Sequence, residues 1–350
     1  MKAVPVKIAY EYSKKTNLLA QWGLNLDEIK DLPERLAKFH QNYCSWMRTC
    51  TRDTSQYGRD YINGLLRMKT KRNINNIART ASVPEQNMQQ FISDSPWSGY
   101  DLISVLQQDI TMHPQFQEES VLIIDESADE KAGEHSAGSG RQHNGRLGKI
   151  EMSQVGVFLS LTNNGYHNWI DGELYFPKKW FTDEYAAKRK RIGMPENRTF
   201  ATKLELALQM TKRAYENGVS FSAVDCDTLY GRSGEFRDAL DQEGFEYYAD
   251  VPLNTQVYLE PPQIVYPLTE RGIASKNHEV IGIPYTVKEV QAHEEIEWEK
   301  IALRPNERGM LRATMPLPQL SPQQAAELVV KHLDNRTRSR KSRLRKALST

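Results

Sequence analysis

The stretch VLIIDESADEKAGEHSAGSGRQHNGRLGK, residues 121–149, decides how this sequence folds. It starts as an apolar run typical of a buried strand, and this strand is predicted to end at Asp125. Beyond the acid the chain is polar, basic and rich in glycine, so its backbone can approach a ligand closely. One acid at a strand end is a weak signal, because loops there are solvated. Its meaning depends on whether other carboxylates reach the same edge of a sheet.

The rest of the pattern predicts an α/β fold with a mixed sheet. Three neighbouring strands are followed by alternating helices and strands, an order that favours a mixed sheet with helices packed on it. The later strands are expected at 153–163, 166–177, 219–227 and 245–252, and the helices at 201–218 and 234–244, with NNG at 163–165 as a hairpin signal. The first and fourth strands can then be neighbours, which would bring Asp125 close to Asp225 or Asp227.

Two carboxylates held this close repel each other, and a divalent cation removes the repulsion. Their hard oxygen atoms suit Mg²⁺ or Mn²⁺. Two such ions about 4 Å apart activate a nucleophile and stabilise a leaving oxygen in phosphodiester chemistry. The loop after Asp125 carries Arg141, Arg146 and Lys149, which could contact DNA phosphates. The structural alternatives are a solvated strand end and a solvated hairpin loop.

Residues 1–115 are predicted to be mostly helical. Ser82-Val83-Pro84-Glu85 predicts a capping box between a short helix near 74–79 and a second helix at about 83–92. This helix-turn-helix-like unit is either DNA-binding or ordinary core packing. Just before it, RMKTKR (67–72) holds four basic residues, and we predict phosphate contacts for Lys69, Lys71 and Arg72. Ser98 is predicted to cap the following helix.

The composition of the whole chain excludes several classes of protein. The 350 residues carry a formal net charge of +1, so overall charge predicts no partner. The three cysteines have no framework spacing, which indicates a reducing compartment, and Cys226 is expected in the core. No signal peptide or membrane-spanning run is evident, so the sequence predicts a soluble cytoplasmic protein without a membrane partner. The spacing of His135, His143 and His167 matches no zinc pattern.

Several blocks, in the right order over roughly 35–310, resemble the bacterial insertion-sequence transposases with a DDE catalytic domain. Residues 123–157, IIDESADEKAGEHSAGSGRQHNGRLGKIEMSQVGV, are similar to the first catalytic block of that family. AVDCDTLYG (223–231) resembles the second, in which the aspartate lies three residues before Tyr-Gly. That spacing selects Asp227 over Asp225. DGELYFPKKW, YINGLL and FISDSPW resemble further blocks of the family.

The resemblance implies an RNase H-like core that cuts DNA at the ends of a mobile element and joins those ends to a target. It implies two metal ions, Mg²⁺ or Mn²⁺, with Asp125 and Asp227 as catalytic residues and metal ligands. Asp225 would then contact the metal ligands without binding the metal itself, or lie at the surface. The partners would be the element ends and the target DNA. Because transposases usually act on paired ends, a homodimer is also implied.

The family's third acid, a Glu on a helix after the second Asp, is not found in its expected block. Glu294, Glu295, Glu297 and Glu327 are the candidates to replace it. The tail from Met315 resembles the end of longer relatives, so we hypothesise an internal deletion with its junction near Gly309–Met315. The rival hypothesis is a non-catalytic DNA-binding protein or repressor derived from a transposase. A general nuclease of the same fold is a weaker third, because the N-terminal blocks resemble transposases specifically.

Three regions are therefore expected. A helical, helix-turn-helix-like region occupies 1–115, an incomplete DDE core 116–315, and an amphipathic helix with a basic tail 316–350.

Overall fold

The computed structural model describes residues 30–117, 119–267, 279–292, 298–306 and 309–316. It divides the chain into two compact units, Met1–Ile110 and Thr111–Thr350. The predicted C-terminal helix and basic tail lie outside the described residues. Within the described residues, no helix is both long and apolar enough to cross a lipid bilayer.

The first unit is helical. Its elements are α3 (Leu32–Tyr43), the short 3-10 helix Cys44–Met47, α4 (Ser55–Arg67), α5 (Ile74–Ala81), α6 (Glu85–Ser93) and α7 (Gly99–Thr111). Its small core consists of buried Ile77, Ala78 and Met88, against which Tyr61 and other side chains of α4 pack. A side chain at Gly64 would place its Cβ 2.5 Å from Ile77 Cγ2, so glycine lets α4 and α5 approach closely.

The turn between α5 and α6 differs from the prediction. Ser82 does not cap α6. It ends α5 in a left-handed conformation, φ 58°, and its backbone N–H is bonded to the carbonyls of Ala78 and Arg79. Pro84 precedes α6 and gives no side-chain cap, so the predicted capping box is wrong. Glu85 instead pairs with Arg79 at 2.5 Å across the turn. The predicted cap at Ser98 is confirmed, because its Oγ accepts from the N–H of Asp101.

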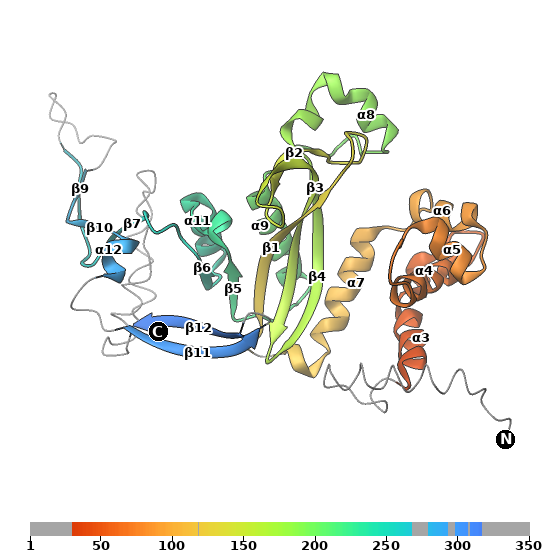
Figure 1. Cartoon of the computed structure of the whole chain (residues 1–350), viewed down its shortest axis with the longest axis horizontal. Helices are drawn as coiled ribbons and strands as arrows, with labels where there is room; N and C mark the ends of the chain where they lie inside the picture. Colours follow the sequence, from red (N-terminus) through yellow and green to blue (C-terminus); the bar gives the residue numbers. More distant parts are fainter. Residues whose placement is uncertain (1–29, 118, 268–278, 293–297, 307–308, 317–350) are drawn as a thin grey trace. The chain divides into compact units, whose positions relative to one another are not determined.

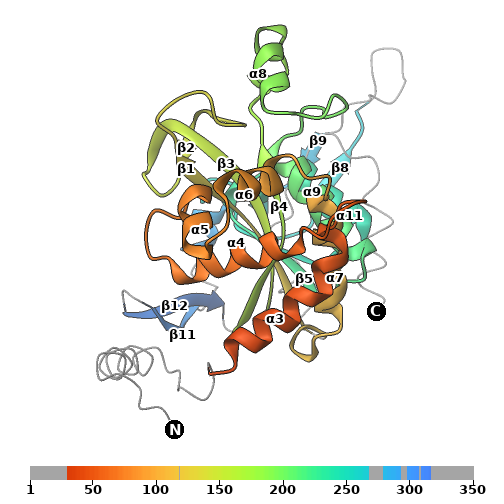
Figure 2. The same ribbon diagram turned by 90° about the vertical axis from the view of Figure 1, so that its right-hand side faces the viewer.

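The second unit is built on a six-stranded mixed sheet (Figures 1 and 2). Its strands are β1 (Val121–Glu130), β2 (Gly140–Asn144), β3 (Lys149–Asn163), β4 (Tyr166–Tyr175), β5 (Ala223–Cys226) and β6 (Tyr247–Ala249). β1 lies between β3, which is antiparallel to it, and β5, which is parallel. β6 continues the sheet parallel to β5, while β2 and β4 pair with the two ends of β3. The predicted mixed sheet, with its first and fourth predicted strands side by side, is confirmed.

Helices cover one face of this sheet. α9 (Lys203–Glu216) packs on β3 and β4, and α11 (Gly234–Glu243) packs against α9. Alternate side chains of β1 and β3 form the core on this face and are at most 1% exposed; they are Leu122, Ile124, Val155, Val157, Leu159 and Leu161. α9 begins with a capping box between Thr202 and Glu205, which fixes where the predicted helix starts. The hairpin at Asn164–Gly165 is also confirmed, because both residues have positive φ.

The same face holds a buried ionic cluster. Arg213 of α9 donates to both carboxylate oxygens of Asp171, at 2.8 and 2.9 Å, and to Glu173 at 3.2 Å. Both acids are on β4, and the side chain of Asp171 is fully buried. The cluster joins α9 to the sheet with charges instead of apolar side chains.

The opposite face of the sheet carries two aromatic rings. Phe158 lies flat over Gly156 and Gly172, where a Cβ would approach its ring to 2.7 and 2.9 Å. Trp169 stacks on it with ring centroids 4.9 Å apart and is 65% exposed. Phe158 is also the register partner of Asp125, so this aromatic surface lies beside the predicted acids.

The first strand is longer than predicted. β1 continues beyond Asp125 to Glu130, because β3 pairs with it as far as Ser153, and the polar loop that follows forms β2.

After β4 the chain forms two 3-10 turns, Lys178–Phe181 and Asp183–Tyr185, and then α8 (Ala186–Arg191). The remaining described elements are a 3-10 turn Pro114–Phe116, α10 (Thr228–Gly231), β7 (Gln256–Tyr258) with β10 (Pro284–Thr286), β8 (Gln263–Val265) with β9 (Glu279–Ile281), α12 (Val287–Gln291), and β11 (Trp298–Asn306) with β12 (Gly309–Pro316).

Candidate metal centre

The register of β1 and β5 brings two acids together. Ile123 pairs with Asp225 and Ile124 with Cys226, so the next step along both chains sets Asp125 beside Asp227. Paired residues of parallel neighbours point to the same face, and neighbouring strands are about 4.8 Å apart. Both acids are exposed and belong to the face of the sheet opposite α9. The structure thus places together the two acids that the sequence selects, and their catalytic role stays a prediction.

Each of the two carboxylates is held through one oxygen. Asp125 Oδ1 accepts from the backbone N–H of Glu126 at 2.8 Å. Asp227 caps α10, and its Oδ1 accepts from the N–H of Leu229 at 2.9 Å. In the part of the chain that the structure describes, neither carboxylate forms an ion pair with a lysine or arginine. One oxygen of each therefore stays available to water or to a cation.

Three ionisable side chains lie behind the acids, on the helix-covered side of the sheet. Tyr230, in α10, is fully buried. Burial raises the pKa of its hydroxyl, and the nearby Glu126 carboxylate raises it further. Glu126 follows Asp125 and pairs with Lys203 at the start of α9, at 3.2 Å. The residue after Asp125 therefore lies near the helix after Asp227. Sequence reasoning missed Glu126 and Lys203, and its only signal for Tyr230 was the Tyr-Gly of the second block.

The second block, AVDCDTLYG, also contains Asp225 and Cys226. Asp225 pairs with Ile123, two residues before the two acids; loss of solvent and the nearby Asp250 carboxylate raise its pKa. Cys226 is buried, as predicted, and burial together with the flanking aspartates raises the pKa of its thiol to about 12. A thiol that stays protonated is a poor nucleophile. The candidate centre is therefore built from carboxylates.

A third ligand is not found among the described residues. They contain no group of three or more His, Cys, Asp or Glu side chains that could hold a metal ion. The candidates Glu294, Glu295, Glu297 and Glu327 lie outside the described residues. Two carboxylates with free oxygens still fit an Mg²⁺-type ion, because such an ion usually keeps several waters and takes only one or two protein carboxylates.

The predicted phosphate contacts fall in two places. Arg141 and Arg146 are exposed on the β2–β3 hairpin and form no ion pair among the described residues, whereas Lys149 pairs with Glu151 at 2.8 Å. That hydrogen bond raises the pKa of Lys149 and lowers that of Glu151. Lys69, Lys71 and Arg72 are exposed between α4 and α5 in the first unit. The roles of these six residues stay predictions.

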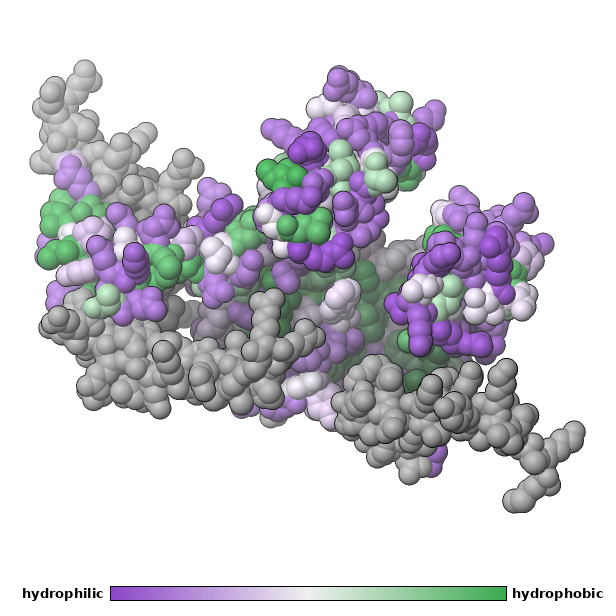
Figure 3. Space-filling model, viewed as in Figure 1, coloured by the Kyte–Doolittle hydropathy of each residue, from purple (hydrophilic) through white to green (hydrophobic). Residues whose placement is uncertain are grey.

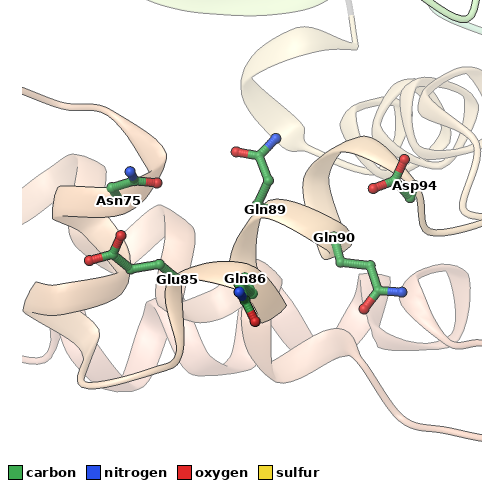
Figure 4. Close-up of a pocket in the computed structure, with 6 residues that line it drawn as sticks. All are labelled: Asn75, Glu85, Gln86, Gln89, Gln90 and Asp94. Carbon is green, nitrogen blue, oxygen red and sulfur yellow. The ribbon is translucent and has the colours of Figure 1, made fainter.

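The first unit has a polar pocket on the helix-turn-helix-like segment (Figure 4). Its lining residues are Asn75, Glu85, Gln86, Gln89, Gln90 and Asp94. The pocket is thus lined by amides and carboxylates and contains no cation, so its chemistry does not fit a phosphate. Amides can donate and accept hydrogen bonds at the edges of DNA bases.

Comparison with known proteins assigns the family. Residues 46–310 match the model of the family described as DDE superfamily endonuclease. A probable transposase for insertion sequence element IS701 from Microchaete diplosiphon is 26% identical over 235 residues, which cover 65% of this chain and 57% of that protein. The chain thus spans little more than half the length of this relative. With the mixed sheet and its helices, the match confirms the expected RNase H-like fold class. The chain belongs to the DDE superfamily endonucleases.

Proposed function

We propose that this chain is an insertion-sequence transposase that acts in the cytoplasm on the ends of its element and on target DNA. The observation that carries the proposal is the placement of Asp125 beside Asp227 on the face of the sheet opposite α9, with no lysine or arginine of the described residues paired to either. Acids that serve only structure normally have an ion-pair partner or are dispersed in solvent. Two of them held side by side are suited to binding a divalent cation.

In this proposal Asp125 and Asp227 hold Mg²⁺ or Mn²⁺, with two ions in an intact site. A bound ion would activate the attacking oxygen and stabilise the leaving oxygen of a phosphodiester. The protein's own contribution is to fix the two carboxylates through Glu126 and Leu229 backbone N–H groups. The phosphate contacts proposed in this unit are Arg141, Arg146 and Lys149, on the β2–β3 hairpin beyond the far end of β1.

The first unit is proposed to read the element ends. In a helix-turn-helix the second helix presents its side chains to base edges. α6 is the second helix here, and it exposes Gln86, Gln89 and Gln90. Glutamine recognises adenine through two hydrogen bonds. Lys69, Lys71 and Arg72 precede this unit, where they would contact the backbone of the same DNA, and a homodimer would hold two ends.

The third acid is the part of the site that needs explanation. We propose that the family's Glu has been lost by internal deletion, with the junction near Gly309–Met315. The tail from Met315, which resembles the end of relatives, supports this. The second candidate function follows from the same loss: a transposase-derived DNA-binding protein that represses an intact relative.

A nicking assay separates the two functions. If the chain is a catalytic transposase, it should nick DNA that carries the element's ends in Mg²⁺ or Mn²⁺ and lose on the order of 100-fold or more of this activity in Asp125→Asn. Such nicking would mean that the chain supplies a third ligand, and it would overturn the proposed deletion. Asp225→Asn is the matched control, because Asp225 lies two residues before Asp227 on the same segment. Specific binding of the ends by the wild-type chain, without nicking in either metal, would identify the repressor instead.

Metal binding can also be measured without DNA. An ion at 10 mM that binds with a Kd near 1 mM would stabilise the folded chain by about 1.4 kcal/mol. We expect Mg²⁺ to raise the melting temperature of the wild type by a few degrees, and to have little effect on Asp125→Asn or Asp227→Asn. An equal shift in all three proteins would show that the ion binds elsewhere.

A further inference from the structure

Two segments of the second unit pack together as a basic lobe, which we define as residues 131–149 and 177–191. Trp180 anchors it, because its ring is fully buried and its Nε1–H donates to the carbonyl of Ser139 at 2.8 Å. Lys188 pairs with Glu134 at 3.2 Å across the same contact. In Figures 1 and 2 the lobe lies at the end of the sheet where β1 and β3 extend, with α8 at its tip. The lobe is therefore a fixed part of the fold.

The tip of the lobe concentrates positive charge. Residues 178–191, KKWFTDEYAAKRKR, contain six lysines or arginines and only two acids. Four of the cations are consecutive, Lys188 to Arg191, and they make up most of α8. Figure 3 shows a largely hydrophilic surface over this helix. Such a density contrasts with the nearly neutral chain as a whole, whose net charge is +1.

Only part of this charge is used within the fold. Lys188 pairs with Glu134 and lies 4.3 Å from the centre of the Tyr185 ring. Arg189 donates to the carbonyls of Trp180 and Thr182, both at 2.6 Å. Lys190 and Arg191 are exposed and form no ion pair within the described residues. The first two cations therefore hold the lobe together, and the last two extend into solvent.

The helix macrodipole alone does not explain Lys190 and Arg191. One cation in the last turn of a helix stabilises it by about 0.3–1 kcal/mol. In so short a helix, each cation added to a row of four also repels its neighbours, and this repulsion opposes folding. Exposed, unpaired cations on a rigid support are what a polyanionic partner binds, because such a partner relieves the repulsion.

We propose that the tip of the basic lobe binds the sugar-phosphate backbone of duplex DNA. β1 runs from Asp125 to Glu130 before it enters the lobe, a length of about 16 Å at about 3.3 Å per residue. A duplex that reaches the acids would meet the lobe about five base pairs further along, at about 3.4 Å per base pair. This inference rests on the proposed function, because it assumes that Asp125 and Asp227 act on DNA. Lysine and arginine side chains aimed at phosphates would hold the duplex in register without reading its sequence.

The test measures DNA binding by the full chain, with fluorescence anisotropy on a labelled duplex over a series of KCl concentrations. Each phosphate contact contributes about 0.9 to the slope of log K against log salt. We expect Lys190→Gln with Arg191→Gln to lower that slope by up to about 2, and to weaken binding about ten-fold or more near 0.1 M KCl. The loss should be equal on element-end and unrelated DNA.

Two controls make the result specific. Lys212→Gln with Lys288→Gln removes the same charge from half-buried Lys212 on α9, which pairs with Glu243, and from exposed Lys288 on α12, and should leave the slope unchanged. The exchange Lys190→Arg with Arg191→Lys keeps the charge and should keep the affinity. Circular dichroism and a melting curve show whether each variant folds.

The outcomes distinguish this inference from the proposed function. An unchanged slope in the Lys190/Arg191 variant overturns it, as does a variant that binds DNA normally but no longer self-associates, because the lobe would then bind a second copy. The assay needs no cleavage. A chain that binds DNA through the lobe but never nicks it would therefore contradict the catalytic proposal and support this one.

Discussion

Replacing Arg213 by leucine is expected to lower the free energy of unfolding of the sheet unit by about 3–5 kcal/mol. Arg213 is a cation of the buried cluster on β4, where it donates two hydrogen bonds to Asp171 and one to Glu173, which also pairs with Arg198 at 3.6 Å. The side chain of Asp171 is fully buried. Leucine has a comparable apolar stem but no charge, so the variant keeps much of the packing and leaves a buried carboxylate without its cation.

Thermal or denaturant unfolding measures this change. For a unit of this size, 1 kcal/mol corresponds to about 2–4 °C, so the melting temperature should fall by roughly 6–20 °C. Arg35→Leu is the matched control, because Arg35 pairs with Asp31 at the surface, with 56% of each side chain exposed. That pair should contribute less than about 1 kcal/mol. Adding Asp171→Leu to Arg213→Leu should recover part of the loss, since it removes the unpaired charge. Equal effects of Arg213→Leu and Arg35→Leu would show that the cluster does not stabilise the fold.

The order of the strands could be predicted from the sequence because its signals are local. Apolar runs mark the strands, Asn164-Gly165 forms the turn it predicts, and Thr202 with Glu205 starts α9. From the order strand, strand, strand, helix, strand, the neighbourhood of β1 and β5 follows by general rules of sheet topology. This neighbourhood is what brings Asp125 to Asp227.

What could not be predicted depends on pairing between distant segments. β1 does not end at Asp125, because β3 extends far enough to pair with it up to Glu130. From the sequence, the two acids of β4 are expected to face solvent. They are buried because Arg213 contacts them from a helix about forty residues later. The basic lobe forms for a similar reason, since the two segments that meet at Trp180 lie on either side of β3 and β4.

In the candidate site, too, one part could be predicted from the local sequence and another part could not. The spacing to Tyr-Gly selected Asp227 over Asp225, and the register agrees, because Asp227 is the residue level with Asp125. The support from Glu126 and Lys203 needs contacts between β1 and α9, which no local pattern shows. The function of Gly231, the second residue of that Tyr-Gly, also depends on a distant backbone segment.

Gly231→Ala is the second prediction with a large effect. Gly231 ends α10, the short helix that Asp227 caps, and its N–H is bonded to the carbonyl of Asp227 at 2.9 Å. A Cβ at this position would overlap the backbone carbonyl oxygen of Asp250, just after β6, and would lie 3.1 Å from the Cβ of Ala249. Backbone cannot rotate out of the way as a side chain does. The alanine must therefore push α10 away from β6, and Asp227 moves with it.

We expect Gly231→Ala to cost about 3 kcal/mol of stability, and the folded fraction to lose its Mg²⁺-dependent rise in melting temperature. The second effect is the more informative, because it reports the position of Asp227 and does not require cleavage. Gly145→Ala is the control, since a Cβ at Gly145 would meet nothing within 4 Å. If Gly231→Ala lost stability but kept the full Mg²⁺ response, the ion would not depend on Asp227. If it lost the response while Gly145→Ala kept it, the close approach of α10 and β6 would be what holds the second acid in place.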